Sequence, residues 1–234
     1  MKHPKLPATQ QAFVNQIRLI EERLFPDELC ADDPSRMKSE GGHYWQYRPS
    51  HHIATGLLTQ ENVTFLSEPG RRLLSVGAYP AFLEKVLVEL GVPSENILLT
   101  DNNPALSQSS DSMQTIIFDL CDAWPAMGTF DRIIFPESLC ISITDTIKRR
   151  GDHRDVQESD GPHASDAIDT EILTGVLRQA FIRLRTGGIL RANGPMSHPN
   201  ILRAMSAKLT QEGLAHAMDS RRFFLAMWPR SSVF

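Results

Sequence analysis

From residue 72 onward, short apolar runs alternate with longer amphipathic stretches, and no other feature constrains the fold of this chain as strongly. Each run is compact and apolar, which is typical of a strand in a sheet that helices cover on both faces. The alternation of such strands with helices predicts βαβ units, and therefore an α/β fold with a mostly parallel sheet. We predict strands over residues 72–76, 97–100, 115–118, 131–135 and 188–192.

Amphipathic helices join and follow the predicted strands. A helix over residues 81–90 connects the first two strands, and Gly91 and Pro93 stop it. A second helix, over residues 170–184, is expected to end at the glycine pair 187–188 and to lead into the last parallel strand. The C-terminal part is predicted as a helix over 198–212 and an antiparallel hairpin of 214–219 and 222–228.

The N-terminal part stands outside this alternation. We expect residues 1–66 to form a helical extension or lid ahead of a Rossmann-like domain over residues 67–234. Apolar residues at helical spacing predict a helix over residues 10–24 and a less regular one over residues 51–66. Between these helices lies an aromatic patch, which either closes over a cleft or anchors the extension, and it consists of Tyr44, Trp45 and Tyr47.

Residues 148–169 form a polar insertion between the fourth and fifth predicted strands. The segment is too polar to belong to a core, so we predict a surface loop. A lid over the site is the alternative, because long loops are often functional.

Length and composition set further limits. The chain has 234 residues, enough for one α/β domain with an extension, and its net charge of −4 gives no strong nucleic-acid signal. Its three cysteines have neither the number nor the spacing of a disulfide framework, which fits a reducing, cytoplasmic location. No stretch of the sequence has the roughly 18 consecutive apolar residues of a membrane span, so we expect no membrane partner.

Other classes of site lack their sequence patterns. The histidines near the N-terminus, His43, His51 and His52, have no accompanying ligand set at a recognisable spacing, so we predict no metal site. The chain contains neither a Gly-x-Ser-x-Gly elbow nor a phosphate-binding lysine loop. Serine hydrolase and nucleoside triphosphatase activities are therefore unsupported.

The first predicted strand runs into the turn at residues 77–81, at the edge where α/β sheets bind ligands. From about residue 73 to about residue 228, the ordered series of motifs resembles the class I S-adenosylmethionine-dependent methyltransferases, with an atypical, glycine-poor first motif. In that family the first strand ends in an acid, and the cofactor's methionine end and ribose pass over a glycine-rich turn. Gly77 matches the first glycine, Ser75 stands at the position of the acid, and Tyr79 and Ala81 stand at those of later glycines. An ordinary strand-to-helix turn is the alternative.

The second predicted strand ends at Asp101 and Asn102, about two dozen residues after the turn. A carboxylate at this spacing can accept hydrogen bonds from both ribose hydroxyls in nucleotide-binding folds. We therefore expect Asp101 to contact the ribose, with an N-cap of the following helix as the alternative.

The third predicted strand is followed by Asp119 and Leu120. The resemblance implies that Asp119 accepts a hydrogen bond from the adenine amino group and that Leu120 packs on the ring. Asp122 is an alternative to Asp119, and simple turn-forming aspartates would explain both.

The fourth predicted strand ends at Pro136 and Glu137, and in the family this strand end faces the transferable methyl group. Glu137 is the candidate catalytic residue, because a carboxylate there can take a proton from the acceptor or orient it. A solvent-facing or helix-capping glutamate is the competing interpretation.

The resemblance implies S-adenosylmethionine as cofactor and methyl transfer to a small or medium-sized acceptor, so a small molecule is the expected partner. We expect Gly77, Ala78 and Tyr79 around the methionine end of the cofactor. Alignment of the reacting atoms supplies most of such catalysis, so few catalytic side chains are needed. A catalytically inactive, methyltransferase-like binding or scaffold protein and transfer of the aminocarboxypropyl group of the same cofactor remain alternatives. A nicotinamide-dependent dehydrogenase ranks lower, because its fuller Gly-x-Gly-x-x-Gly turn is missing.

Overall fold

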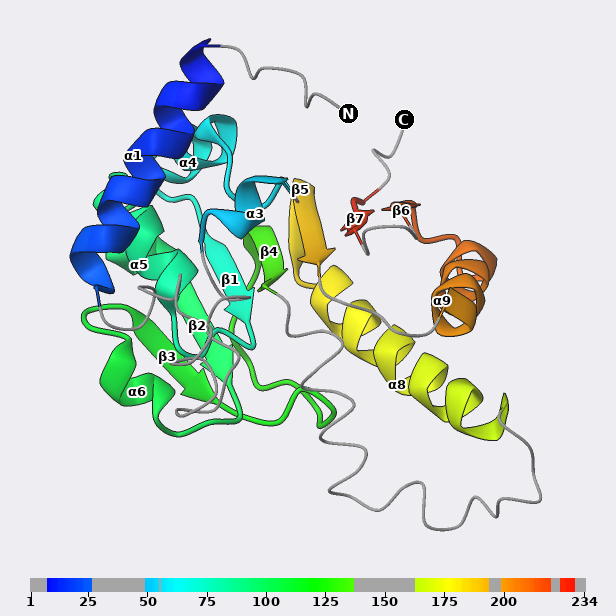
Figure 1. The fold of residues 1–234 in the computed structure, drawn as a ribbon. Coiled ribbons are helices and arrows are strands. Elements are labelled where there is room, and N and C mark those ends of the chain that lie inside the picture. The colour runs from blue at the N-terminus through cyan, green and yellow to red at the C-terminus, as the bar shows by residue number, and fades with distance from the viewer. Residues whose placement is uncertain are drawn as a thin grey trace, which may run out of the picture.

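A seven-stranded sheet runs through the molecule in the order β3-β2-β1-β4-β5-β7-β6 (Figure 1). The structure is a computed structural model that describes residues 8–26, 49–54, 56–136, 163–193, 199–219 and 224–229. The strands, all within this part of the chain, are β1 (Leu73–Val76), β2 (Ile97–Asp101), β3 (Gln114–Ile117), β4 (Phe130–Pro136), β5 (Leu184–Asn193), β6 (His216–Asp219) and β7 (Phe224–Met227).

The sheet is mostly parallel, with an antiparallel hairpin at its C-terminal end. β1 pairs in parallel with both β2 and β4, while β7 pairs antiparallel with β5 and β6. The chain therefore leaves β1 toward β2 on one side and later returns to β4 on the other. Ligands bind at such a reversal in strand order, just beyond the carboxyl ends of the strands. These findings confirm the predicted Rossmann-like α/β class and its terminal hairpin.

Helices cover both faces of the sheet. α1 (Ala8–Leu24), α4 (Gln60–Leu66) and α5 (Phe82–Glu89) share one buried cluster, and α8 (His163–Phe181) and α9 (Pro199–Gln211) share another. In Figure 1 the two groups lie on opposite sides of the sheet. Two single-turn helices, α3 (His51–Ala54) and α6 (Leu106–Ser109), complete the described helices together with a 3₁₀ turn at Ser94–Asn96.

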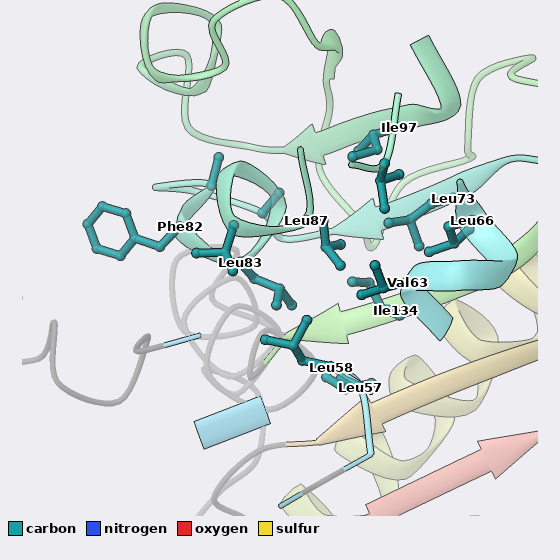
Figure 2. Close-up of a cluster of buried hydrophobic side chains, with 14 of the residues drawn as sticks. Leu57, Leu58, Val63, Leu66, Leu73, Phe82, Leu83, Leu87, Ile97 and Ile134 are labelled. Atoms are coloured by element: carbon teal, nitrogen blue, oxygen red, sulfur yellow. The ribbon is translucent and has the colours of Figure 1, made fainter. Parts of the chain in front are cut away.

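Successive residues of one strand enter opposite clusters. Leu73 is buried with α4 and α5, and its neighbour Leu74 is buried with α8 and α9. This follows from the two-residue period of a strand, which sends alternate side chains to opposite faces. Figure 2 shows the first cluster, in which Val63, Leu73 and Leu87 come from α4, β1 and α5 and converge between helix and sheet.

The prediction of one helix over residues 51–66 was wrong. α3 and α4 are separate, because Gly56 adopts a φ of 75° and Thr59 then caps α4 by accepting a hydrogen bond from the amide of Asn62. A positive φ ends a helix, and a threonine with extended backbone begins the next one.

Two predictions near α8 were also wrong. The helix begins at His163, so the end of the segment predicted as a polar loop is helical. The residues after His163 include two alanines and an isoleucine, which offset the polar composition that suggested a loop. The helix also ends before Gly187, and this glycine lies inside β5, beside a break in the register with β4, at a φ of 77°. A glycine in this conformation is typical of a β-bulge, which the sequence did not distinguish from a helix end.

Among the described helices, none combines the length and the apolar character that crossing a membrane demands.

Candidate functional site

The turn after β1 is held against the end of β2 by backbone hydrogen bonds. The amides of Gly77 and Ala78 both donate to the carbonyl of Thr100, at 2.8 and 3.0 Å. Gly77 has a φ of 69°, which a glycine adopts without steric cost. The chain therefore reverses tightly at the carboxyl edge of the sheet and leads into the first turn of α5.

Asp101 fixes the next residue of the turn. Its Oδ2 accepts a hydrogen bond from the amide of Tyr79 at 3.0 Å, and its Oδ1 accepts one from Asn103 at 2.8 Å. Burial raises the pKa of Asp101, and the amides of Tyr79, Asn103 and Asn102 oppose this effect. The predicted N-cap alternative does not describe this contact, because the N-cap of α6 is Ala105. A carboxylate has about four acceptor positions, so beyond these three amides one position remains for a further donor.

Glu84 is a member of this site that the sequence reasoning missed. It lies in the first turn of α5, and its carboxyl group accepts a hydrogen bond from the Ser75 hydroxyl, nine residues earlier on β1. The Glu84 side chain is buried, and burial raises its pKa to about 7. The signal was an acid in the otherwise apolar run of residues 81–83 and 86–88, where a charged residue has to face the interior.

A small cavity lies where the turn, α5 and β4 meet. Its volume is about 10 Å³, close to the space that one water-sized group needs. Pro136 enters it from the end of β4 and His52 from α3, so these two elements also face the turn. The remaining lining residues are Gly77, Ala78, Tyr79, Pro80, Phe82, Leu83 and Glu84.

The structure thus brings most of the predicted cofactor-binding residues together. Gly77, Ala78, Tyr79 and Pro136 line one cavity, and Asp101 is bonded to the turn that forms it. Ser75 reaches the same cavity only through Glu84.

Asp119 and Leu120 lie shortly after the end of the neighbouring strand β3, which ends at Ile117. The amide of Phe118 donates to the carbonyl of Asp101 at 2.9 Å, so the two strand ends are adjacent. Asp119 Oδ1 accepts from the amide of Cys121 at 2.9 Å, as a turn-forming aspartate does, and Leu120 is buried beside Trp124. Neither residue lines the small cavity.

Several candidates fall outside the described residues. Glu137, the proposed catalytic residue, is one of them, and His43 and the aromatic patch of Tyr44, Trp45 and Tyr47 are others.

A larger cavity of about 590 Å³ lies between α1 and the α3–α4 corner. This volume is in the range of small-molecule pockets. Ile53 lines it, and the preceding residue His52 lines the small cavity, so α3 contributes to both. Among the described residues, its lining carries amide, hydroxyl and apolar side chains and no formal charge: Thr9, Gln10, Ala12, Phe13, Gln16, Ile53, Leu58, Thr59 and Gln60.

The fold is similar to those of solved methyltransferases. The sugar N-methyltransferase KedS8 from a Streptoalloteichus species is 13% identical over 77% of this chain and 92% of its own, with a TM-score of 0.50. A methyltransferase from Pyrococcus furiosus is 13% identical over 94% of this chain and 98% of its own, also with a TM-score of 0.50. The chain therefore has the Rossmann-like fold of the class I S-adenosylmethionine-dependent methyltransferases. No protein-family model and no curated protein matches the sequence.

Proposed function

We propose that this protein is an S-adenosylmethionine-dependent methyltransferase that acts on a small or medium-sized acceptor. The observation that carries the proposal is the turn at residues 77–79, joined to Asp101 at the reversal in strand order of a methyltransferase fold. This edge of an α/β sheet is where nucleotide-like ligands bind.

The acidic side chains at the turn suit the positive charges of this cofactor. S-adenosylmethionine carries a positively charged sulfonium and an ammonium group, and the acidic side chains of Glu84 and Asp101 lie at the turn. Asp101 also retains acceptor capacity for a ribose hydroxyl, because three backbone amides use three of the about four acceptor positions of its carboxylate.

Different residues are proposed to bind the different parts of the cofactor. In this proposal Gly77, Ala78 and Tyr79 surround the methionine end, and Asp101 with Asn102 holds the ribose. The adenine lies against two residues at the end of β3, Asp119 and Leu120.

When bound, S-adenosylmethionine supplies an activated methyl group. Pro136 ends β4 and Glu137 follows it in the sequence, and both residues are proposed to lie near this group. Glu137 is proposed to take or orient the proton of the acceptor, and the surrounding residues align the acceptor with the methyl carbon.

A binding or scaffold protein without activity is the second candidate, and two observations favour it. Tyr79 and Ala81 occupy positions where the family has glycine, and the cavity beneath the turn holds only about 10 Å³. A side chain at such a position keeps a ligand from approaching the backbone closely.

Isothermal titration calorimetry with S-adenosylmethionine and S-adenosylhomocysteine separates the two candidates. A methyltransferase binds both ligands, whereas absence of binding at millimolar concentration favours the scaffold. If the cofactor binds and is consumed, product analysis identifies the transferred group. S-adenosylhomocysteine indicates methyl transfer, and methylthioadenosine indicates transfer of the aminocarboxypropyl group.

A further inference from the structure

Glu84 occupies an unusual place for a glutamate. Only 1% of its surface is exposed, and it stands in the first turn of α5 with its carboxyl group against the Ser75 hydroxyl. A buried carboxyl is costly unless hydrogen bonds or an opposite charge compensate for it. The Ser75 hydroxyl and a backbone amide of its own helix turn are weak compensation for a carboxylate that can accept about four hydrogen bonds.

No basic side chain neutralises this region in the part of the chain that the structure describes. Neither Glu84 nor Asp101 forms an ion pair there with a lysine or arginine, and the charged group acting on Glu84 is Asp101, another acid. Within the described residues, Asp101 accepts hydrogen bonds from the amides of Tyr79, Asn103 and Asn102, whereas Glu84 accepts backbone hydrogen bonds only within its own helix turn. Among the residues that line the cavity, Glu84 is therefore the main one whose carboxylate can still accept hydrogen bonds from a ligand.

The cavity that Glu84 lines has the size of a single small polar group. Its volume of about 10 Å³ matches one water-sized group, and a primary ammonium is of that size. An ammonium donates three hydrogen bonds, so it can satisfy a buried carboxylate. A sulfonium has no hydrogen to donate.

We propose that Glu84 is a binding residue for the α-ammonium group of the cofactor's methionine portion, an inference that rests on the proposed function. Glu84 contributes from α5 the negative charge that Ser75 does not supply from β1. The deprotonated carboxylate is the binding form. Where Glu84 is protonated in the free protein, binding releases that proton to solvent and the ammonium keeps its own.

The affinity should therefore depend on pH. Burial raises the pKa of Glu84 to about 7, so about a tenth of the free protein carries the carboxylate at pH 6 and about three quarters at pH 7.5. Affinity falls with the fraction of the competent form, so binding should tighten about eightfold over this interval. The other titratable groups near the Glu84 carboxyl group are Asp101 from β2, Tyr79 from the turn and His52 from α3.

The test measures dissociation constants by calorimetry at pH 6 and pH 7.5, in buffers of different ionisation enthalpy. S-adenosylhomocysteine is the main ligand, because it keeps the ammonium and lacks the sulfonium charge. Methylthioadenosine, which lacks the whole amino-acid portion, is the control ligand. Glu84→Gln should weaken binding of S-adenosylhomocysteine about 10- to 100-fold at pH 7.5, abolish the pH dependence and abolish proton release.

Two variants serve as matched controls. Glu89→Gln changes an exposed acid on the same helix, which pairs with Arg23. It should leave the dissociation constants, their pH dependence and the proton release unchanged. His52→Gln removes the titratable group that α3 contributes to the cavity. The pH dependence of binding should remain in this variant. Circular dichroism at both pH values establishes that each variant is folded.

The outcomes are distinguishable. If the wild-type protein binds neither ligand, the proposed function fails and this inference fails with it. If S-adenosylhomocysteine binds equally to wild type and folded Glu84→Gln, this inference alone is overturned. It is also overturned if the variant loses affinity for methylthioadenosine to the same extent, or if the pH dependence disappears in His52→Gln and persists in Glu84→Gln.

Discussion

Replacing Glu84 with glutamine should stabilise the protein at alkaline pH. In the folded state burial raises the pKa of Glu84 to about 7, from an ordinary value of 4.5. The folded protein therefore keeps a proton that the unfolded chain releases as the pH rises above 4.5. The stability linked to this proton is fully present below about pH 4.5 and is lost as the pH rises through about 7.

The size of the effect follows from these two pKa values. The interval from 4.5 to about 7, at about 1.4 kcal/mol per pH unit, amounts to about 3 kcal/mol of unfolding free energy. Glutamine keeps the shape of the side chain and does not titrate. At pH 8, Glu84→Gln should therefore be about 3 kcal/mol more stable than wild type, with a melting temperature about 10 °C higher.

Urea unfolding followed by circular dichroism at pH 4.5, 6, 7 and 8 measures this difference. The gap between variant and wild type should be smallest at pH 4.5 and should widen up to about pH 8. Glu89→Gln, on the exposed side of the same helix, should show no such widening. A gap that stays constant with pH, or a wild type more stable than the variant at pH 8, would refute the reasoning.

Three further predictions concern binding and packing. Asp101→Ala should weaken cofactor binding by about 1–3 kcal/mol, and unchanged affinity in a folded variant, measured by calorimetry, would contradict the ribose assignment. Asp131 accepts hydrogen bonds from the Arg72 amide and from the partly exposed Arg185 at 2.9 and 2.7 Å, so Asp131→Ala should cost about 1–3 kcal/mol in urea unfolding. Gly77→Ala should cost about 1 kcal/mol because of its φ of 69°, whereas Gly175→Ala, inside α8 with open space around it, should stabilise by about the same amount in thermal unfolding.

The strand pattern of the fold was readable from the sequence, because each core strand is a short apolar run. All five predicted parallel strands exist, and their ends differ from the predictions by a few residues at most. The glycine pair at residues 187–188 was misread, because a helix end and a β-bulge both require a residue that tolerates a positive φ. Local sequence does not distinguish these two uses.

The candidate site was only partly readable. The turn at residues 77–79 and Asp101 were predicted because they follow strands directly, and their contact is observed. Glu84 was missed because its meaning depends on Ser75, which lies on another element and meets it only in the folded protein. The roles assigned to Asp119, Leu120 and Glu137 remain predictions.

The one-turn helix α3 contributes to the walls of both cavities. Its consecutive residues His52 and Ile53 border different cavities, so any displacement of α3 reshapes both at once. A compound beside α1 would alter affinity at the turn after β1 only if binding at each of the two sites favoured one position of α3 over another. By thermodynamic reciprocity, occupancy of that turn would change affinity for the compound by the same factor.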